Sequence, residues 1–387
     1  MSPSTEAPLT LHLSVGPALI AFAVDRHDLS RTEVGRVVLA APIQYVWPHP
    51  TRSLLYVASS NRSISKADDV HSLATVEVDE RTGALRVIGQ VDLPTRPIHL
   101  TVEPSGLRLF VAYNVPSLVT VHAIRPDGRA TQATPQASPP SSGIYPHQVL
   151  VMPSGRAAIV VARGDDARHG KPEQPGSLRV LSLEDDALRP LQTVAPGDGY
   201  GFGPRHLDFH PSGRWVAVSI ERQNELHVYS LTGDTLSAEP VFKLSTLPAP
   251  PRSPHDQLAG AIRFHPNGKT LYVVNRNDTA IYGDGTIPSD FEGNNIAVYS
   301  FDDQTGRPEL LQYVLTESVH VRTFSLDVTG RILVAASILP STVRRGDGVE
   351  KVPARLSFFR VANDGRLTLA RLDDMGNERE SMFWSRL

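Results

Sequence analysis

The chain has 387 residues, and its 38 Lys+Arg and 41 Asp+Glu give a formal net charge of −3 at pH 7. This balance excludes a polybasic nucleic-acid-binding protein, and the absence of Cys excludes disulfides, a thiolate nucleophile and thiolate-bound zinc. The chain is 40% hydrophobic and only 20% charged, so it can form a core, and its 28 Gly and 32 Pro are scattered along it, which predicts many short elements in one body.

The N-terminal segment MSPSTEAPLTLHLSVG has no basic stretch followed by an apolar one, and no apolar run nearby reaches the roughly 18 residues of a membrane span. We therefore expect a soluble cytoplasmic protein that binds neither membranes nor nucleic acid. Three runs rich in apolar and β-branched residues follow, and they predict strands at 9–15, 18–25 and 33–40.

A turn motif then recurs six times, each time between two runs typical of a β-hairpin. The copies are WPHPTRSLLYVASSN, VEPSGLRLFVAYNVP, VMPSGRAAIVVARGD, FHPSGRWVAVSIERQ, FHPNGKTLYVVNRND and LDVTGRILVAASILP. Their turn positions are Arg52, Gly106, Gly155, Gly213, Gly268 and Gly330. Successive turns are 49 to 62 residues apart, which is the length of a four-stranded propeller blade with variable loops.

Six units leave three N-terminal strands and the C-terminal segment SMFWSRL unassigned, and together these make one more blade. A blade shared by both termini also removes the open edge of the ring. We therefore predict one all-β domain over residues 1–387, a seven-bladed β-propeller whose last blade is closed by the C-terminal strand near Phe383. An open β-sandwich would not explain a constant turn at this period.

Residues at equal distances from the turns lie at equal depth in the propeller, so the six copies define columns. Eight residues before the turn, at the start of the innermost strand, the column reads Gln44, Ile98, His147, Arg205, Gly260 and Arg322. Eight residues after it, at the end of the second strand, it reads Ser60, Asn114, Arg163, Glu221, Arg276 and Ile338. In an antiparallel hairpin these positions are neighbours, so both columns are expected at one rim of the central channel.

Charged residues concentrate in these two columns, whereas most inner-strand positions are apolar. Four arginines around one carboxylate and one imidazole favour a small substrate with carboxylate or phosphate groups. We predict catalytic roles for His147, Glu221, Arg205 and Arg276, and substrate binding by Arg163, Arg322, His206 and Asn114. The alternative is a polar, water-filled channel in which Arg205 and Glu221 form only a structural salt bridge.

Three other histidines, His49, His210 and His265, belong to the turn motif itself, so we expect them at the opposite end of their strands as turn residues. No His/Asp spacing typical of a metal site and no Gly-rich loop opening a helix is present, so we expect no metal and no cofactor.

The run GPRHLDFHPSGRWVAVSIERQNELHVYSL, followed by FHPNGKTLYVVNR, resembles the seven-bladed propeller lactonase family, which includes 6-phosphogluconolactonases and the fungal 3-carboxy-cis,cis-muconate lactonizing enzyme. The resemblance extends nearly end to end, to ESMFWSRL. It implies a seven-bladed propeller and places the family's proposed active-site residues on His147, Arg205, Glu221 and Arg276. The chain departs from the family at Arg163, where many relatives have an acidic or small residue, and in the longer segments 163–177 and 282–295.

The first functional hypothesis is a lactone hydrolase acting on an anionic sugar lactone, with Glu221 or His147 as general base and Arg205 and Arg276 binding the anion and the developing oxyanion. A carboxymuconate-type cycloisomerase could use the same groups, and Arg163 favours a polyanionic substrate. A noncatalytic propeller that binds protein partners is the third hypothesis; it predicts an aromatic, apolar rim, whereas the columns are charged.

Overall fold

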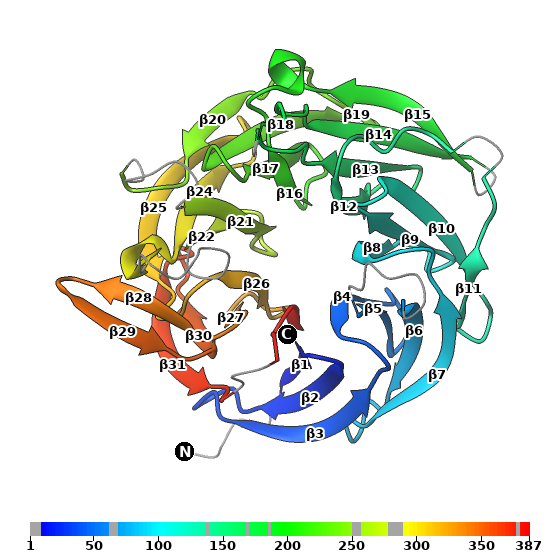
Figure 1. Cartoon of the computed structure of the whole chain (residues 1–387). Helices are drawn as coiled ribbons and strands as arrows, with labels where there is room; N and C mark the ends of the chain where they lie inside the picture. Colours follow the sequence, from blue (N-terminus) through cyan, green and yellow to red (C-terminus); the bar gives the residue numbers. More distant parts are fainter. Residues whose placement is uncertain are drawn as a thin grey trace.

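The computed structural model describes residues 9–61, 69–136, 139–167, 170–184, 187–249, 257–277, 289–376 and 380–387. Seven antiparallel sheets stand as blades around a central channel, with one innermost strand of each blade at the axis (Figure 1). This confirms the predicted seven-bladed β-propeller. Within these ranges, no helix has the length and apolar character needed to cross a membrane.

Six blades follow one another along the chain, and each runs from an innermost to an outermost strand. Blade 1 is β4 (Ile43–Pro48), β5 (Leu54–Ser60), β6 (His71–Val78) and β7 (Leu85–Asp92); blade 2 is β8 (Pro97–Val102), β9 (Arg108–Tyr113), β10 (Leu118–Ile124) and β11 (Ala130–Ala133); blade 3 is β12 (Pro146–Val151), β13 (Ala157–Ala162), β14 (Ser177–Glu184) and β15 (Ala187–Val194). Blade 4 is β16 (Pro204–Phe209), β17 (Trp215–Ile220), β18 (Glu225–Thr232) and β20 (Phe242–Ser245), with β19 (Thr235–Leu236) also on β18; blade 5 is β21 (Gln257–Phe264), β22 (Thr270–Asn277), β24 (Asn295–Asp302) and β25 (Arg307–Leu315); blade 6 is β26 (Val321–Leu326), β27 (Ile332–Ser337), β30 (Arg355–Val361) and β31 (Leu367–Asp374).

The seventh blade joins the two ends of the chain, as predicted. Its strands, from the inside out, are β32 (Ser385–Arg386), β1 (Leu9–Val15), β2 (Ala18–Val24) and β3 (Arg31–Val38). The C-terminal strand forms two residues beyond the predicted Phe383, with Ser385 paired to Leu13 and Arg386 to His12. The adjacent Trp384 is 4% exposed, and its N–H donates a 2.9 Å hydrogen bond to Ser14 Oγ.

Burial follows the position of a strand in its blade. All seven residues of β5 are buried, whereas the outermost strand β7 contains no buried residue. Blades pack face to face, so both faces of a middle strand are covered and its sequence is almost continuously apolar. Between blades 1 and 2, for example, Val57 belongs to the same buried cluster as Leu100 and Val111.

The histidines of the turn motif connect neighbouring blades. His210 Nε2 lies 2.8 Å from the carbonyl oxygen of Gly268 in the next blade, and His265 Nε2 lies 3.0 Å from that of Gly330. His49 Nε2 makes the same contact with Gly106 at 3.2 Å. The prediction that these histidines are turn residues is therefore confirmed. Each of them also contacts the turn of the next blade.

One small sheet lies outside the seven blades. It consists of β23 (Ser289–Asp290), β28 (Ser341–Arg345) and β29 (Gly348–Val352), and the β28–β29 hairpin projects from blade 6 (Figure 1). Of the predicted insertion at 282–295, residues 282–288 lie outside the described ranges; the rest includes β23 and the short 3₁₀ helix η2 (Phe291–Gly293). A second 3₁₀ helix, η1 (Pro196–Gly199), precedes blade 4.

Candidate active site

A β-bulge interrupts the innermost hairpin of every one of the six internal blades. In each, the register between the first and second strands shifts at the same depth, so that one or two residues of the inner strand have no partner. The unpartnered residues are Gln44, Ile98, His147, Arg205, Gly260 with Ala261, and Arg322. These are the residues of the column predicted eight positions before the turn.

The bulges explain why this column faces the channel. Regular strand residues of a blade alternate toward its two neighbouring blades, whereas a bulged residue leaves the ladder and its side chain is redirected. Gln44, Ile98, His147, Arg205 and Arg322 all line one small cavity of about 20 Å³. Blade 5 has Gly260 at this depth, where an added Cβ would lie 3.2 Å from Arg276 Nη1. The glycine therefore leaves room for the arginine.

Glu221, which follows β17 in blade 4, is the centre of the charged cluster. Its Oε1 lies 2.8 Å from Arg205 Nε, and its Oε2 accepts a 2.9 Å hydrogen bond from Arg163 Nη1 of blade 3. Arg276 of blade 5 also donates a hydrogen bond to Oε1. One carboxylate thus contacts guanidinium groups from three consecutive blades.

Burial alone would raise the pKa of Glu221, but the charges of Arg276, Arg163 and Arg205 outweigh it and lower the pKa well below its ordinary value. The carboxylate is therefore ionised throughout the neutral range. Burial, and then the nearby charge of Arg276, lower the pKa of Arg205. Arg205 shares the Glu221 carboxylate with two other arginines, so a bound anion would further stabilise its cationic form.

His147 lies beside this cluster and has no hydrogen bond to its buried Nδ1 from any described residue. Burial lowers its pKa well below 6.5, and the charges of Arg205, Arg322 and Arg163 add to the effect. The imidazole is therefore neutral at physiological pH and can accept a proton. His206 packs beside it, with ring centroids 5.1 Å apart, and His206 Nδ1 lies 3.3 Å from Arg205 Nη1.

The remaining predicted binding residues differ in their placement. Arg163 contacts Glu221, and its Cζ lies 4.4 Å from the centroid of the Tyr145 ring. Arg322 lines the cavity with His147, its Cζ 4.9 Å from the centroid of the Phe383 ring. Asn114 is buried just after β9 and does not line the cavity beside His147, so this geometry gives no support to its predicted role.

Sequence reasoning missed several residues near the site. Arg96, Tyr45 and Thr323 line the same cavity, and Arg96 Nε donates a 3.2 Å hydrogen bond to Gln44 Oε1. Tyr45 and Thr323 stand one position after the bulge in their blades, so the next column along would have identified them. Arg96 precedes strand β8 and lies outside both columns, so its distance from the turn did not mark it as a site residue.

The described residues contain no cluster of three or more His, Asp or Glu side chains arranged to hold a metal ion. The cluster around Glu221 itself provides a neutral imidazole, an ionised carboxylate and four guanidinium groups. Such a site can bind an anion, move one proton and stabilise a developing negative charge.

Known proteins similar to this chain have the same fold, and the similarity covers nearly the whole chain. Residues 15–344 match the family model described as "Lactonase, 7-bladed beta-propeller". The chain is 25% identical to a 6-phosphogluconolactonase of Bacillus subtilis over 361 residues, which cover 91% of this chain and 89% of the relative. It is 28% identical to a 6-phosphogluconolactonase of Pectobacterium carotovorum over 261 residues, covering 67% and 69% of the two chains. Among solved structures, the periplasmic gluconolactonase of Pseudomonas aeruginosa superposes with a TM-score of 0.73 at 21% identity, covering 96% of this chain and 98% of that one.

Proposed function

This chain belongs to the lactonase family of seven-bladed β-propellers, and on that basis we propose that it hydrolyses a small sugar lactone that carries a negatively charged group. The observation that carries the proposal is the excess of positive over negative charge in the cluster of His147, Arg163, Arg205, Glu221, Arg276 and Arg322, here called the bulge cluster. Three guanidinium groups contact a single carboxylate beside a neutral imidazole, and a fourth guanidinium, that of Arg322, lines the adjacent cavity. An anionic substrate supplies the missing negative charge, and a 6-phosphogluconolactone is the first candidate.

The imidazole of His147 is the better general base of the two groups that the sequence left open. Glu221 is held by three arginines that lower its pKa, so it is a weak proton acceptor and serves to position those arginines. His147 is neutral and its Nδ1 is unpartnered among the described residues. The negative charge of a bound substrate would offset the neighbouring arginines and raise the pKa of His147 toward the neutral range.

The reaction then proceeds in two steps. His147 removes a proton from water as the water oxygen attacks the lactone carbonyl carbon, and a tetrahedral oxyanion forms. Arg276, whose buried Nε and Nη1 have no partner among the described residues, stabilises that oxyanion. The ring C–O bond then breaks, and the protonated His147 returns its proton to the departing alkoxide oxygen, giving the open-chain hydroxy acid.

Access to the site requires side chains to move. The cavity of about 20 Å³ beside His147 holds a water molecule but not a sugar lactone. Arg96 and Arg322 line it and are partly exposed, and both have long flexible side chains. We infer that the anionic group of the substrate draws these two arginines aside as it binds.

The test is a substrate panel in which spontaneous hydrolysis is subtracted: 6-phosphoglucono-δ-lactone, glucono-δ-lactone and a carboxymuconate, each with and without chelator. We expect hydrolysis of the phosphorylated lactone, a lower kcat/KM for the neutral one, and no effect of the chelator. His147→Asn should lower kcat by about a hundred to ten thousand fold. Arg366→Gln, at an exposed turn ion pair, is the matched control. Failure to exceed the spontaneous rate on either lactone would refute the proposal.

The carboxymuconate arm tests the cycloisomerase alternative. In that alternative the arginines bind the carboxylates of the substrate, and Arg163 favours a polyanionic one. Arg163 already contacts Glu221 and the Tyr145 ring, so less of its binding capacity remains for substrate. Turnover of the carboxymuconate without lactone hydrolysis would favour the cycloisomerase.

We further propose that the protein acts in the cytoplasm, where proteins rarely contain disulfides, because the chain has no Cys. One structural neighbour is described as periplasmic, so the fold is not restricted to the cytoplasm. Cell fractionation with an antibody against the chain distinguishes them.

A further inference from the structure

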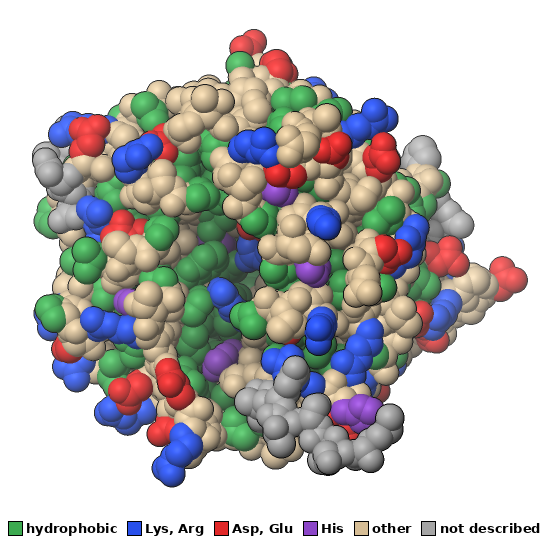
Figure 2. Space-filling view, turned by 180° about the vertical axis from the view of Figure 1, so that it is seen from behind, with side chains coloured by type: hydrophobic (Ala, Val, Ile, Leu, Met, Phe, Trp, Pro, Cys, Tyr) green, Lys and Arg blue, Asp and Glu red, His purple; other side chains and the backbone are tan. Residues whose placement is uncertain are grey.

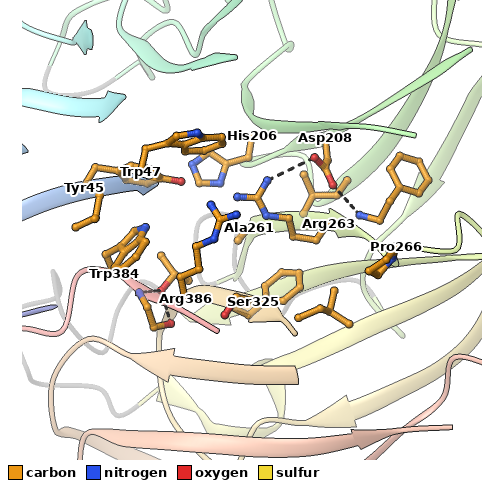
Figure 3. Close-up of a pocket in the computed structure, with 17 residues that line it drawn as sticks. Tyr45, Trp47, His206, Asp208, Ala261, Arg263, Pro266, Ser325, Trp384 and Arg386 are labelled. Carbon is orange, nitrogen blue, oxygen red and sulfur yellow. Dashed lines mark hydrogen bonds and ion pairs between the residues drawn. The ribbon is translucent and has the colours of Figure 1, made fainter. Parts of the chain in front are cut away.

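A second cavity, larger than the first, lies farther along the channel toward the turn end of the inner strands. Its volume is about 310 Å³, and it is lined by Trp47, Asp208, Arg263 and Ser325, which stand five residues before the turns of blades 1, 4, 5 and 6 (Figure 3). The bulged residues, such as His147 and Arg205, stand eight residues before the turns. Three residues of extended strand, about 10 Å, therefore separate them from the residues that line the second cavity. Seen from the side opposite to Figure 1, the centre of the ring is hollowed, with Lys/Arg and His side chains within the hollow (Figure 2).

Three side chains form the boundary between the two cavities. Tyr45, His206 and Thr323 line both of them, so each cavity has its own set of charged groups on either side of this layer. The Tyr45 ring also packs against buried His99, with centroids 4.0 Å apart. The larger cavity is therefore separate from His147, Glu221 and Arg276, which do not line it.

The second cavity carries excess positive charge. Arg263 and Arg386 point toward one another into it, and Asp208 is the one carboxylate among the residues that line it (Figure 3). Asp208 is already engaged: Arg263 Nη1 lies 3.5 Å from its Oδ1, and the Phe264 N–H donates a 2.8 Å hydrogen bond to its Oδ2. No carboxylate of a described residue forms an ion pair with Arg386.

The charge of Arg386 is poorly compensated. Burial, and then the neighbouring charge of Arg263, lower the pKa of Arg386 to about 10. An anion placed between the two guanidinium groups would offset their mutual repulsion, and a carboxylate or phosphate matches the planar donor fork of arginine.

The walls of the cavity suit the body of an organic anion. Trp47 and Trp384 both line it, and Arg386 Cζ lies 5.7 Å from the centroid of the Trp47 ring. Ser325 and Thr323 also line it, and their hydroxyl oxygens accept hydrogen bonds from the N–H groups of Leu387 and Ser385. A volume of about 310 Å³ is at the lower end of the range for small-molecule pockets and is sufficient for a sugar-sized molecule.

We propose that this cavity is a second ligand site, which binds a sugar-sized organic anion with its carboxylate or phosphate between Arg263 and Arg386 and its body against Trp47. The site is distinct from the bulge cluster and does not depend on the function proposed for that cluster.

The test is direct binding to the intact chain, with 6-phosphogluconate, gluconate and inorganic phosphate as separate probes. Two of the three tryptophans of the chain line the cavity, so tryptophan emission reports its occupancy and calorimetry gives the affinity. All titrations are repeated in Arg276→Gln, which weakens the bulge cluster. We expect saturable binding of an organic probe that persists in Arg276→Gln, and an emission change that is reduced in Trp47→Phe.

Arg386→Gln and Arg263→Gln should each weaken this binding at least tenfold, Arg386→Lys should weaken it less, and Arg366→Gln should leave it unchanged. Because Arg386 lies in the closing strand, the melting temperature of each variant is measured, and Arg263→Gln decides the matter if Arg386→Gln does not fold. Binding that is unchanged in Arg263→Gln, or that disappears in Arg276→Gln, would overturn the proposal. Saturable binding of inorganic phosphate, without binding of either organic probe, would overturn the proposal that the ligand is an organic anion.

Discussion

The carboxylate of Glu221 in blade 4 contacts the guanidinium of Arg276 in blade 5, and each of the two side chains is only 3% exposed. Arg163 and Arg205 contact the same carboxylate from blades 3 and 4. A single buried anion therefore holds three cations that would otherwise repel one another across two blade boundaries. The geometry of the candidate active site depends on this one charge.

Glu221→Gln should therefore destabilise the fold as well as the site. Removing one partner of a buried ion pair leaves uncompensated charge and typically costs about 3–5 kcal/mol. We expect a loss of that size in the free energy of unfolding, measured with urea. The double variant Glu221→Gln/Arg276→Met should recover part of it, because one of the unpaired cations is also removed. A single variant as stable as the parent would show that the cluster does not depend on this carboxylate.

Gly268→Ala and Gly213→Ala form a matched pair that measures the contact between blades 4 and 5. Both glycines occupy the same turn position, with φ of +73° and +70°, so both substitutions carry the strain of a left-handed residue, about 1–2 kcal/mol. Only at Gly268 would the new Cβ approach another blade, 2.6 Å from His210 Nε2; at Gly213 nothing lies within 4 Å.

We expect Gly268→Ala to lower the melting temperature more than Gly213→Ala, and His210→Ala to reduce the difference by removing the clash. Equal melting temperatures for the two alanine variants would contradict the predicted contact between the blades.

Deletion of residues 380–387 should prevent closure of the ring. It removes β32, leaves the inner edge of β1 unpaired and exposes the apolar surface that Met382 and Trp384 cover. We expect insoluble protein or a large loss of stability, because an unpaired strand edge promotes aggregation. Soluble expression with the melting temperature of the full chain would refute closure by the termini.

His12 should make stability depend on pH. Burial, and then the charge of neighbouring Arg386, lower its folded-state pKa from 6.5 to about 4. As pH falls from 6.5 toward 4, the unfolded chain binds a proton that the folded chain does not, so the free energy of unfolding decreases. The contribution is at most about 1.4 kcal/mol per pH unit.

Urea unfolding between pH 7.5 and pH 4.5 measures this dependence. His12→Gln should make the decrease shallower, whereas His27→Gln, at an exposed position, should follow the parent. Parallel curves for His12→Gln and the parent would contradict the predicted pKa shift.

The sequence by itself determined the architecture, because the turn motif recurs at a spacing that only a propeller blade explains, and because the strands left at the two ends make one further blade. It also selected His147, Arg205, Glu221 and Arg276, since equal distance from a turn means equal depth along the channel. Neither inference required knowing how distant residues meet.

Tertiary structure decided the rest. The bulges that turn His147 and Arg205 toward the channel are changes of register, which depend on the partner strand and leave no mark in a single copy of the motif. The contacts of Glu221 join three blades, so the lowered pKa of its carboxyl group follows from charges brought together across blade boundaries. Arg386 reaches Arg263 only because the C-terminal strand closes the ring, and no spacing along the chain predicts a contact that closure creates.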